Sequence, residues 1–135
     1  MAADWRSWRV MARDSLTAAK VLHKEHLFRA SASRAYYAAY LAVSAVNIYI
    51  GRSQPPAREA WSHEDTPRMI MDHWQRFVAS SAKRRDLARR LGLLYKLRIS
   101  SDYFGQVGPG EGSTTKALRD ATVLVKTAER ILPLR

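Results

Sequence analysis

Residues 34–40 read RAYYAAY and residues 98–103 read RISSDY, and these two stretches decide how the chain is interpreted. Each lies within a pattern typical of a packed helix. Each also places an arginine beside small residues and tyrosines, on or next to a face that should be apolar. A buried guanidinium is costly unless a partner compensates its charge. Two of them in one helical chain therefore indicate a polar site and not only a hydrophobic core.

Hydrophobic periodicity predicts helices around both stretches and elsewhere along the chain. Apolar side chains recur at three- and four-residue steps, as expected when one face of a helix is buried. No segment alternates like a strand, and the 135 residues suit one domain with one core. We therefore expect a single domain over 1–135, all-α, built as an antiparallel up-and-down four-helix bundle with extra short helices. The expected helices cover about 4–23, 28–50, 66–78, 84–104 and 113–131.

Capping residues predict where two of these helices begin. Thr66 is a favourable N-cap and Pro67 suits the first helical position. The apolar face of that helix continues to Val78. Ser113 or Thr114 is the expected N-cap of the last helix.

The charge of the chain is strongly positive, with a formal net charge of +11. Such a field attracts nucleic acid, an anionic membrane surface or an acidic protein, and the charge alone does not choose among them. There is no cysteine, which excludes disulfides and zinc–thiolate sites and favours a cytoplasmic protein. No stretch approaches the roughly 18 apolar residues that a membrane span needs, so no membrane association is expected.

Arg98 and Asp102 are four residues apart and would share one helix face, with Tyr103 beside them. One interpretation is a structural ion pair at the end of the core. The other is an anion site, because a guanidinium held by a carboxylate can still bind phosphate. Arg34 and Tyr37 are candidates to join it, although tyrosines at this spacing also fit a core.

The four histidines show no spacing typical of a metal site, and we expect neither metal nor cofactor. His63 differs from the others because it lies in a polar loop, from which it could reach a site formed by helices. The chain also lacks a Walker-type phosphate loop, a dinucleotide fingerprint and a Gly-x-Ser-x-Gly motif.

Taken in order, the RAYYAAY helix, the loop histidine His63 and Leu97–Arg98 followed by Asp102–Tyr103 resemble HEPN domains of the stand-alone prokaryotic kind. The resemblance implies an antiparallel helical bundle, commonly a homodimer. It also implies a role in RNA or nucleotide binding, often as a ribonuclease or as part of a toxin–antitoxin pair with a nucleotidyltransferase partner protein.

The chain departs from that family at its catalytic motif, an arginine followed four to six residues later by histidine. Arg98 matches the arginine, but Tyr103 stands where the histidine would be. Two other matches, Arg58 with His63 and Arg68 with His73, lie outside the usual place of the motif. A complete set of catalytic groups within one subunit is therefore not visible, although a dimer could bring Arg98 and a histidine together.

Three functions remain open at this point. The preferred one is a module that binds RNA or nucleotide in a toxin–antitoxin or defence system without catalysis. The alternatives are a metal-independent endoribonuclease toxin acting as a dimer and a structural helical adaptor for a partner protein. The candidate catalytic residues are Arg98, His63 and Tyr103, and the candidate binding residues are Arg34, Tyr37, Arg98, Asp102 and Tyr103.

Overall fold

The computed structural model describes residues 4–51, 62–103 and 108–134, and within these ranges the chain forms five α-helices and no strand. This confirms the predicted all-α class. The helices are α1 (Trp5–Lys24), α2 (Phe28–Tyr49), α3 (Asp65–His73), α4 (Ser81–Tyr103) and α5 (Glu111–Ile131).

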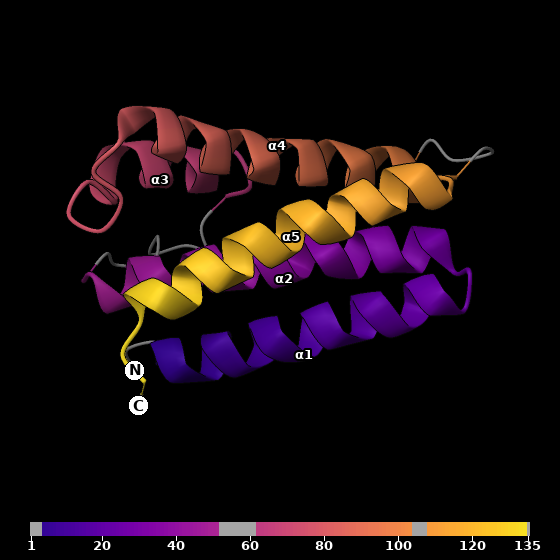
Figure 1. The fold of residues 1–135 in the computed structure, drawn as a ribbon, viewed down its shortest axis with the longest axis horizontal. Helices are drawn as coiled ribbons and strands as arrows, with labels where there is room; N and C mark the ends of the chain where they lie inside the picture. Colours follow the sequence, from indigo (N-terminus) through magenta and orange to yellow (C-terminus); the bar gives the residue numbers. More distant parts are fainter. Residues whose placement is uncertain (1–3, 52–61, 104–107, 135) are drawn as a thin grey trace.

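The four long helices lie side by side, and each runs opposite in direction to the long helix before it (Figure 1). α2 is central, because it packs against α1, α5, α4 and α3. The short α3 lies along the first half of α4, and α1 begins at the end of the molecule where α5 finishes. In the part of the chain that the structure describes, no helix is both long and apolar enough to cross a membrane.

Small residues let the other helices approach α2 closely. Six alanines of this helix are at most 3% exposed, namely Ala32, Ala35, Ala38, Ala39, Ala42 and Ala45. Trp74 closes the core beyond the end of α3 and is fully buried, with its indole Nε1 donating to Asn47 Oδ1 at 2.9 Å. Burial of the indole is tolerated because its only donor is satisfied.

The turn between α1 and α2 is short because His26 adopts the left-handed conformation, with φ of 60°. The amide of His26 bonds to the carbonyl of His23, and that of Leu27 bonds to the carbonyl of Leu22. This is the Schellman pattern that closes many helices. It places the first turn of α2 directly after the last turn of α1.

The predicted start and end of the third helix are both wrong: α3 begins at Asp65 with Glu64 as its N-cap, so Thr66 lies inside its first turn. α3 stops at His73, and the amides of Phe77 and Val78 both bond to the carbonyl of Trp74 in a turn. Arg84 fixes this turn from the first residues of α4, because its Nη1 donates to the carbonyls of Val78 and Ala79 at 2.8 and 2.9 Å. Periodicity could not distinguish this packed turn from a further helical turn.

The predicted start of the last helix is also wrong. α5 begins at Glu111 with Gly110 as its N-cap, so Ser113 and Thr114 lie inside the helix. Thr114 is fully buried, and its hydroxyl donates to the carbonyl of Gly110 at 2.8 Å. Glu111 in the first turn favours this earlier start, since a carboxylate there complements the helix dipole.

Candidate functional site

Arg98 is the first element of the site and lies near the end of α4. Its side chain is only 14% exposed, and its Nε is 3.3 Å from Asp102 Oδ2. The geometry is that of an ion pair without a hydrogen bond, since this buried Nε has no hydrogen-bond partner. The predicted pairing of Arg98 with Asp102 is therefore present, and Arg98 faces the interior instead of bulk solvent.

Two tyrosines of α2 supply the rest of the environment of Arg98. Its guanidinium carbon lies 4.9 Å from the ring centre of Tyr37 and 5.8 Å from that of Tyr36. A cation over an aromatic face is stabilised by the ring quadrupole, more so when it is desolvated. This contact explains how one partly exposed carboxylate suffices to hold a guanidinium that is mostly removed from water.

His63 joins the same cluster from the loop before α3. Its Nδ1 is hydrogen-bonded to the hydroxyl of Tyr36, its ring stacks on Tyr95, and the ring of Tyr40 meets it edge-on. The loop itself is held by Ser62, whose hydroxyl accepts from the amide of Asp65 at 3.1 Å. The expectation that a loop histidine would reach the helices is thus met by aromatic contacts from α2 and α4.

Two groups of this cluster, His63 and Tyr36, are pushed toward their neutral forms. Burial, and then the positive charge of Arg98, lowers the pKa of His63 below its usual value. Burial also raises the pKa of the Tyr36 phenol, with a further contribution from Tyr40, and Arg98 opposes this rise only in part. At neutral pH the site therefore combines a neutral imidazole, a protonated phenol and one guanidinium.

An open groove adjoins the cluster at the beginning of α2, and we call it the α2 groove. It has a volume of about 670 Å³, and the side chains that give it its chemistry are His26, Phe28, Arg29, Arg34, Tyr37 and Asp102. Arg29 is packed near Gly108, where a Cβ would come within 3.2 Å of the arginine Nη2. Because Tyr37 and Asp102 contact Arg98 and also line the groove, Arg98 lies directly behind its wall.

A comparison with known families matches the HEPN domain over residues 5–134, nearly the whole chain. The chain belongs to the HEPN family. No curated protein matches it. The match confirms the family that the motifs in α2 and α4 indicated, and it covers both the Arg98 cluster and the α2 groove.

The structure brings most of the predicted site residues of this HEPN domain together. Arg98, His63 and Asp102 form one cluster with Tyr37, and Arg34 is exposed and lines the α2 groove together with Tyr37. The side chain of Tyr103 and the whole of Arg58 lie outside the described residues.

Tyr95, His26 and Arg29 belong to the site but were missed in the sequence. The signal for Tyr95 is its position three residues before Arg98, which places the two side chains on the same helix face, one turn apart. His26 and Arg29 carry no such signal, because only the tight turn between α1 and α2 brings them to the groove.

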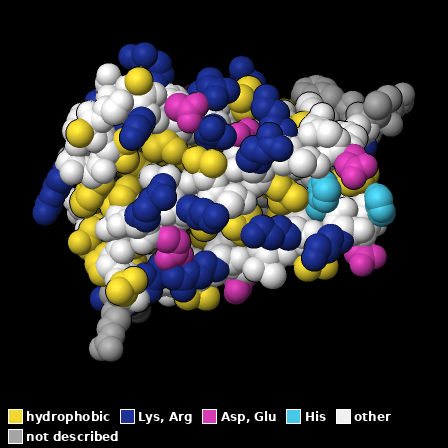
Figure 2. All heavy atoms as spheres, viewed as in Figure 1, with side chains coloured by type: hydrophobic (Ala, Val, Ile, Leu, Met, Phe, Trp, Pro, Cys, Tyr) yellow, Lys and Arg dark blue, Asp and Glu magenta, His cyan; other side chains and the backbone are white. Residues whose placement is uncertain are grey.

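A groove larger than the α2 groove lies elsewhere on the described part of the HEPN domain. A groove of about 1060 Å³ lies between the beginning of α4 and the end of α5, lined mainly by apolar side chains such as Phe77, Leu87 and Val123. Figure 2 shows hydrophobic side chains between the beginning of α4 and the end of α5. Among the described residues, no group of three or more histidine or carboxylate side chains is placed to hold a metal ion.

Proposed function

We propose that this HEPN domain binds RNA or a nucleotide through Arg98 and the α2 groove, without cleaving it. The observation that carries this proposal is the state of Arg98. Two tyrosine rings and one carboxylate hold its guanidinium in place, yet it donates no hydrogen bond to any described residue. A fixed guanidinium with unused donors suits a phosphate oxygen.

The surroundings of Arg98 support an anionic ligand. Arg29 and Arg34 line the adjoining groove, and Tyr37 and Phe28 offer aromatic faces for a base. Figure 2 shows lysine and arginine side chains spread over the visible face, with few acidic ones between them. With a net charge of +11, the domain attracts a polyanion over long range, and the groove supplies the short-range contacts.

The protonation state of His63 favours binding over catalysis. The Tyr36 phenol stays protonated, and its hydroxyl can donate a hydrogen bond to His63 Nδ1. Nδ1 then acts as the acceptor, so the neutral imidazole carries its own proton on Nε2. In that tautomer His63 is a hydrogen-bond donor for a phosphate oxygen. A general base would instead need a free nitrogen lone pair directed at the 2′-hydroxyl of RNA.

A metal-independent endoribonuclease is the second candidate, and one observation favours it. His63 and Arg98 lie close enough within one chain for the arginine charge to act on the imidazole. A base and a cation of this kind are two of the groups that metal-free RNA cleavage needs. Release of labelled fragments from RNA in the presence of a chelator, lost in Arg98→Ala, would establish this function.

The biological setting that we propose rests on the family. The four long helices are taken as the up-and-down bundle of one HEPN domain, which forms a homodimer in the cytoplasm. It acts in a toxin–antitoxin or defence system beside a nucleotidyltransferase partner protein. Light scattering of the purified protein tests the dimer, and co-purification with the product of a neighbouring reading frame tests the partner.

The binding proposal is tested by fluorescence anisotropy with a labelled single-stranded RNA at several salt concentrations. Arg98→Met keeps most of the packing volume but removes the charge, and we expect it to weaken binding about tenfold or more. Arg85→Met is the matched control, because Arg85 is exposed on the same helix. Equal affinities for the wild type and Arg98→Met would contradict the proposal.

A further inference from the structure

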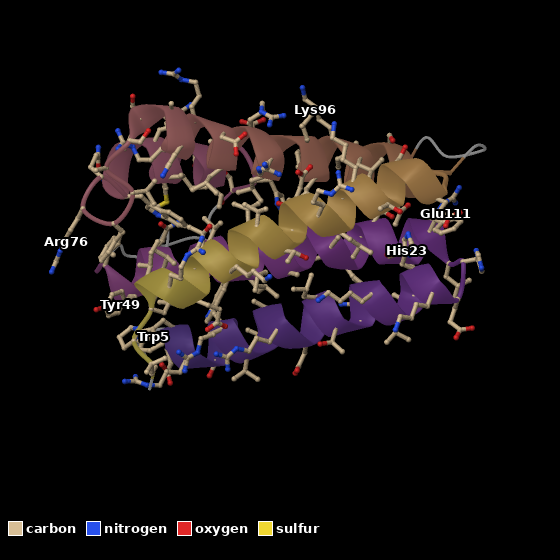
Figure 3. The ribbon with its side chains drawn as sticks, viewed as in Figure 1. Trp5, His23, Tyr49, Arg76, Lys96 and Glu111 are labelled. Carbon is tan, nitrogen blue, oxygen red and sulfur yellow. The ribbon has the colours of Figure 1, made fainter. Side chains whose placement is uncertain are left out.

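Aromatic rings and arginines alternate at the end of the molecule where α1 begins and α2 finishes. Figure 3 shows Trp5, Tyr49 and Arg76 gathered at this end, with His23 and Glu111 at the opposite one. We call this feature the aromatic end surface and define it by six residues: Trp5, Arg6, Arg9, Tyr49, Arg76 and Phe77.

The three rings of the aromatic end surface form a continuous row. Trp5 and Tyr49 meet edge to face with centroids 5.6 Å apart, and Tyr49 and Phe77 are tilted at 6.4 Å. They come from α1, α2 and the turn after α3, so the row crosses three segments of the chain. Tyr49 is its most open member, with 39% of its surface exposed.

Guanidinium groups cover both ends of this row. Those of Arg6 and Arg9 lie 4.4 and 5.0 Å from the ring centre of Trp5, and that of Arg76 lies 5.4 Å from the ring centre of Phe77. Arg9 is fixed further, since its Nη1 donates to the carbonyl of Pro133 at 2.5 Å. Arg76 is exposed and pairs with no described carboxylate, which leaves its charge available.

We propose that the aromatic end surface is a second contact for single-stranded RNA. Bases stack on tyrosine rings and on guanidinium planes, while the arginine charges attract the phosphates between them. This inference rests on the proposed function and makes it more specific. The ligand is then an RNA strand of several nucleotides that reaches from the α2 groove to this surface, and not a free mononucleotide.

The distance between the two contacts agrees with such a ligand. Tyr37 and Tyr49 are twelve residues apart on α2, which corresponds to about 18 Å along the helix. A mononucleotide in the α2 groove cannot reach Tyr49. An RNA strand several nucleotides long spans this distance.

An anionic membrane is the main rival as the partner of this surface, because tryptophan, tyrosine and arginine are also common at lipid interfaces. The rings here do not project as an inserting wedge. Trp5 packs against the core, Phe77 is half-buried, and two arginines already cover the indole. Rings held in this way expose their edges, and the arginines above them expose guanidinium planes on which a base can stack. Such a surface suits bases better than acyl chains.

The test compares two labelled uridylate oligomers, one of three nucleotides and one of twelve, binding to the full chain. Arg76→Gln and Tyr49→Ala should each weaken binding of the longer oligomer about fivefold or more and leave the shorter one unchanged. Lys96→Gln is the charge-matched control on the outer side of α4, and it should have a smaller effect. Circular dichroism checks that Tyr49→Ala folds. If Tyr49→Ala does not fold, Arg76→Gln alone provides the test, because Arg76 is exposed and its substitution should not disturb the fold.

The outcomes separate this inference from the proposed function. If Arg98→Met weakens both oligomers but Arg76→Gln acts no more strongly than Lys96→Gln, the end surface is not an RNA contact and the proposed function stands. If Arg98→Met changes neither oligomer, the proposed function fails. If Arg76→Gln leaves RNA binding intact but abolishes binding to phosphatidylserine vesicles, the surface contacts lipid and our inference is wrong.

Discussion

The imidazole of His63 lies nearly parallel to the ring of Tyr95, with centroids 4.9 Å apart and 13° between the planes. This contact joins the loop before α3 to α4, and the hydroxyl of Tyr36 joins the same imidazole to α2. Three separate segments therefore meet on one titratable ring. The protonation of that ring should then affect both the stability of the fold and the site beside Arg98.

Stability should fall as His63 becomes protonated. Its pKa is lowered in the folded chain, so between its unfolded value of about 6.5 and its folded value the unfolded chain binds a proton that the folded chain does not. The free energy of unfolding should therefore be highest above pH 6.5 and decrease as the pH drops through this window. One such group contributes at most about 1.4 kcal/mol per pH unit. Urea denaturation between pH 7.5 and 5 measures the slope.

His63→Gln identifies the source of that slope. The variant should be less stable at pH 7.5, because the stacking on Tyr95 is lost, but its stability should change less with pH. His73→Gln at the end of α3 is the control and should keep the slope of the wild type. A His63→Gln protein with an unchanged slope would show that another group titrates in this range.

Asp102→Asn distinguishes a structural ion pair from an anion site. The change keeps the shape of the side chain but removes a negative charge 3.3 Å from Arg98 and on the wall of the α2 groove. If the groove binds phosphate, RNA affinity should rise about two- to fivefold at low salt, while stability falls by less than about 1 kcal/mol. Anisotropy titrations and urea denaturation measure the two effects. Weaker RNA binding would mean that Asp102 is needed to position Arg98.

The polar site was predictable to the extent that it lies on regular helices. Arg98 and Asp102 are one turn apart, and their pairing follows from helix geometry alone. The contact between Tyr37 of α2 and Arg98 of α4 depends on how the two helices pack against each other. Periodicity within one helix does not determine that packing. Nor does the sequence show that His63 stacks on Tyr95, because the path of a loop depends on contacts formed after the helices assemble.

The helix ends show the same limit for the fold. Asp4 caps α1, and Gly51, with φ of 87°, follows α2; both residue types are common at these positions of helices. The end of α3 was misplaced because Val78 fits the apolar helix pattern but packs in the turn that follows the helix. The start of α5 was misplaced because Thr114 resembles an N-cap residue but is buried inside the first helical turn. Local preference gives the existence of a helix more securely than its boundaries.

Trp74→Phe should destabilise the domain strongly. The indole is fully buried, and the change removes its hydrogen bond to Asn47 Oδ1 as well as part of its volume. A cavity and an unsatisfied carbonyl together should cost about 2–4 kcal/mol. Trp8→Phe is the control, because Trp8 is only half-buried on α1 and should cost less. In an Asn47→Leu background, Trp74→Phe should lower the free energy of unfolding by less than it does in the wild type, because the hydrogen bond is already absent. If the losses of the two single variants simply add in the double variant, as measured by urea denaturation, Trp74 and Asn47 are not coupled.

Asp120 should contribute more to stability than Asp86, although both carboxylates bind Arg90. Arg90 Nη1 is 2.6 Å from Asp120 Oδ1 and its Nε is 2.8 Å from Asp86 Oδ2, but the side chain of Asp120 is 8% exposed and that of Asp86 is 41% exposed. Asp120→Ala removes a buried link between α5 and α4 and should cost about 2–3 kcal/mol. Asp86→Ala should cost less than about 1 kcal/mol, because water screens an exposed pair. Raising the salt concentration should reduce the effect of Asp86→Ala more than that of Asp120→Ala in urea denaturation. Equal losses for the two variants would mean that burial does not strengthen the pair between the helices.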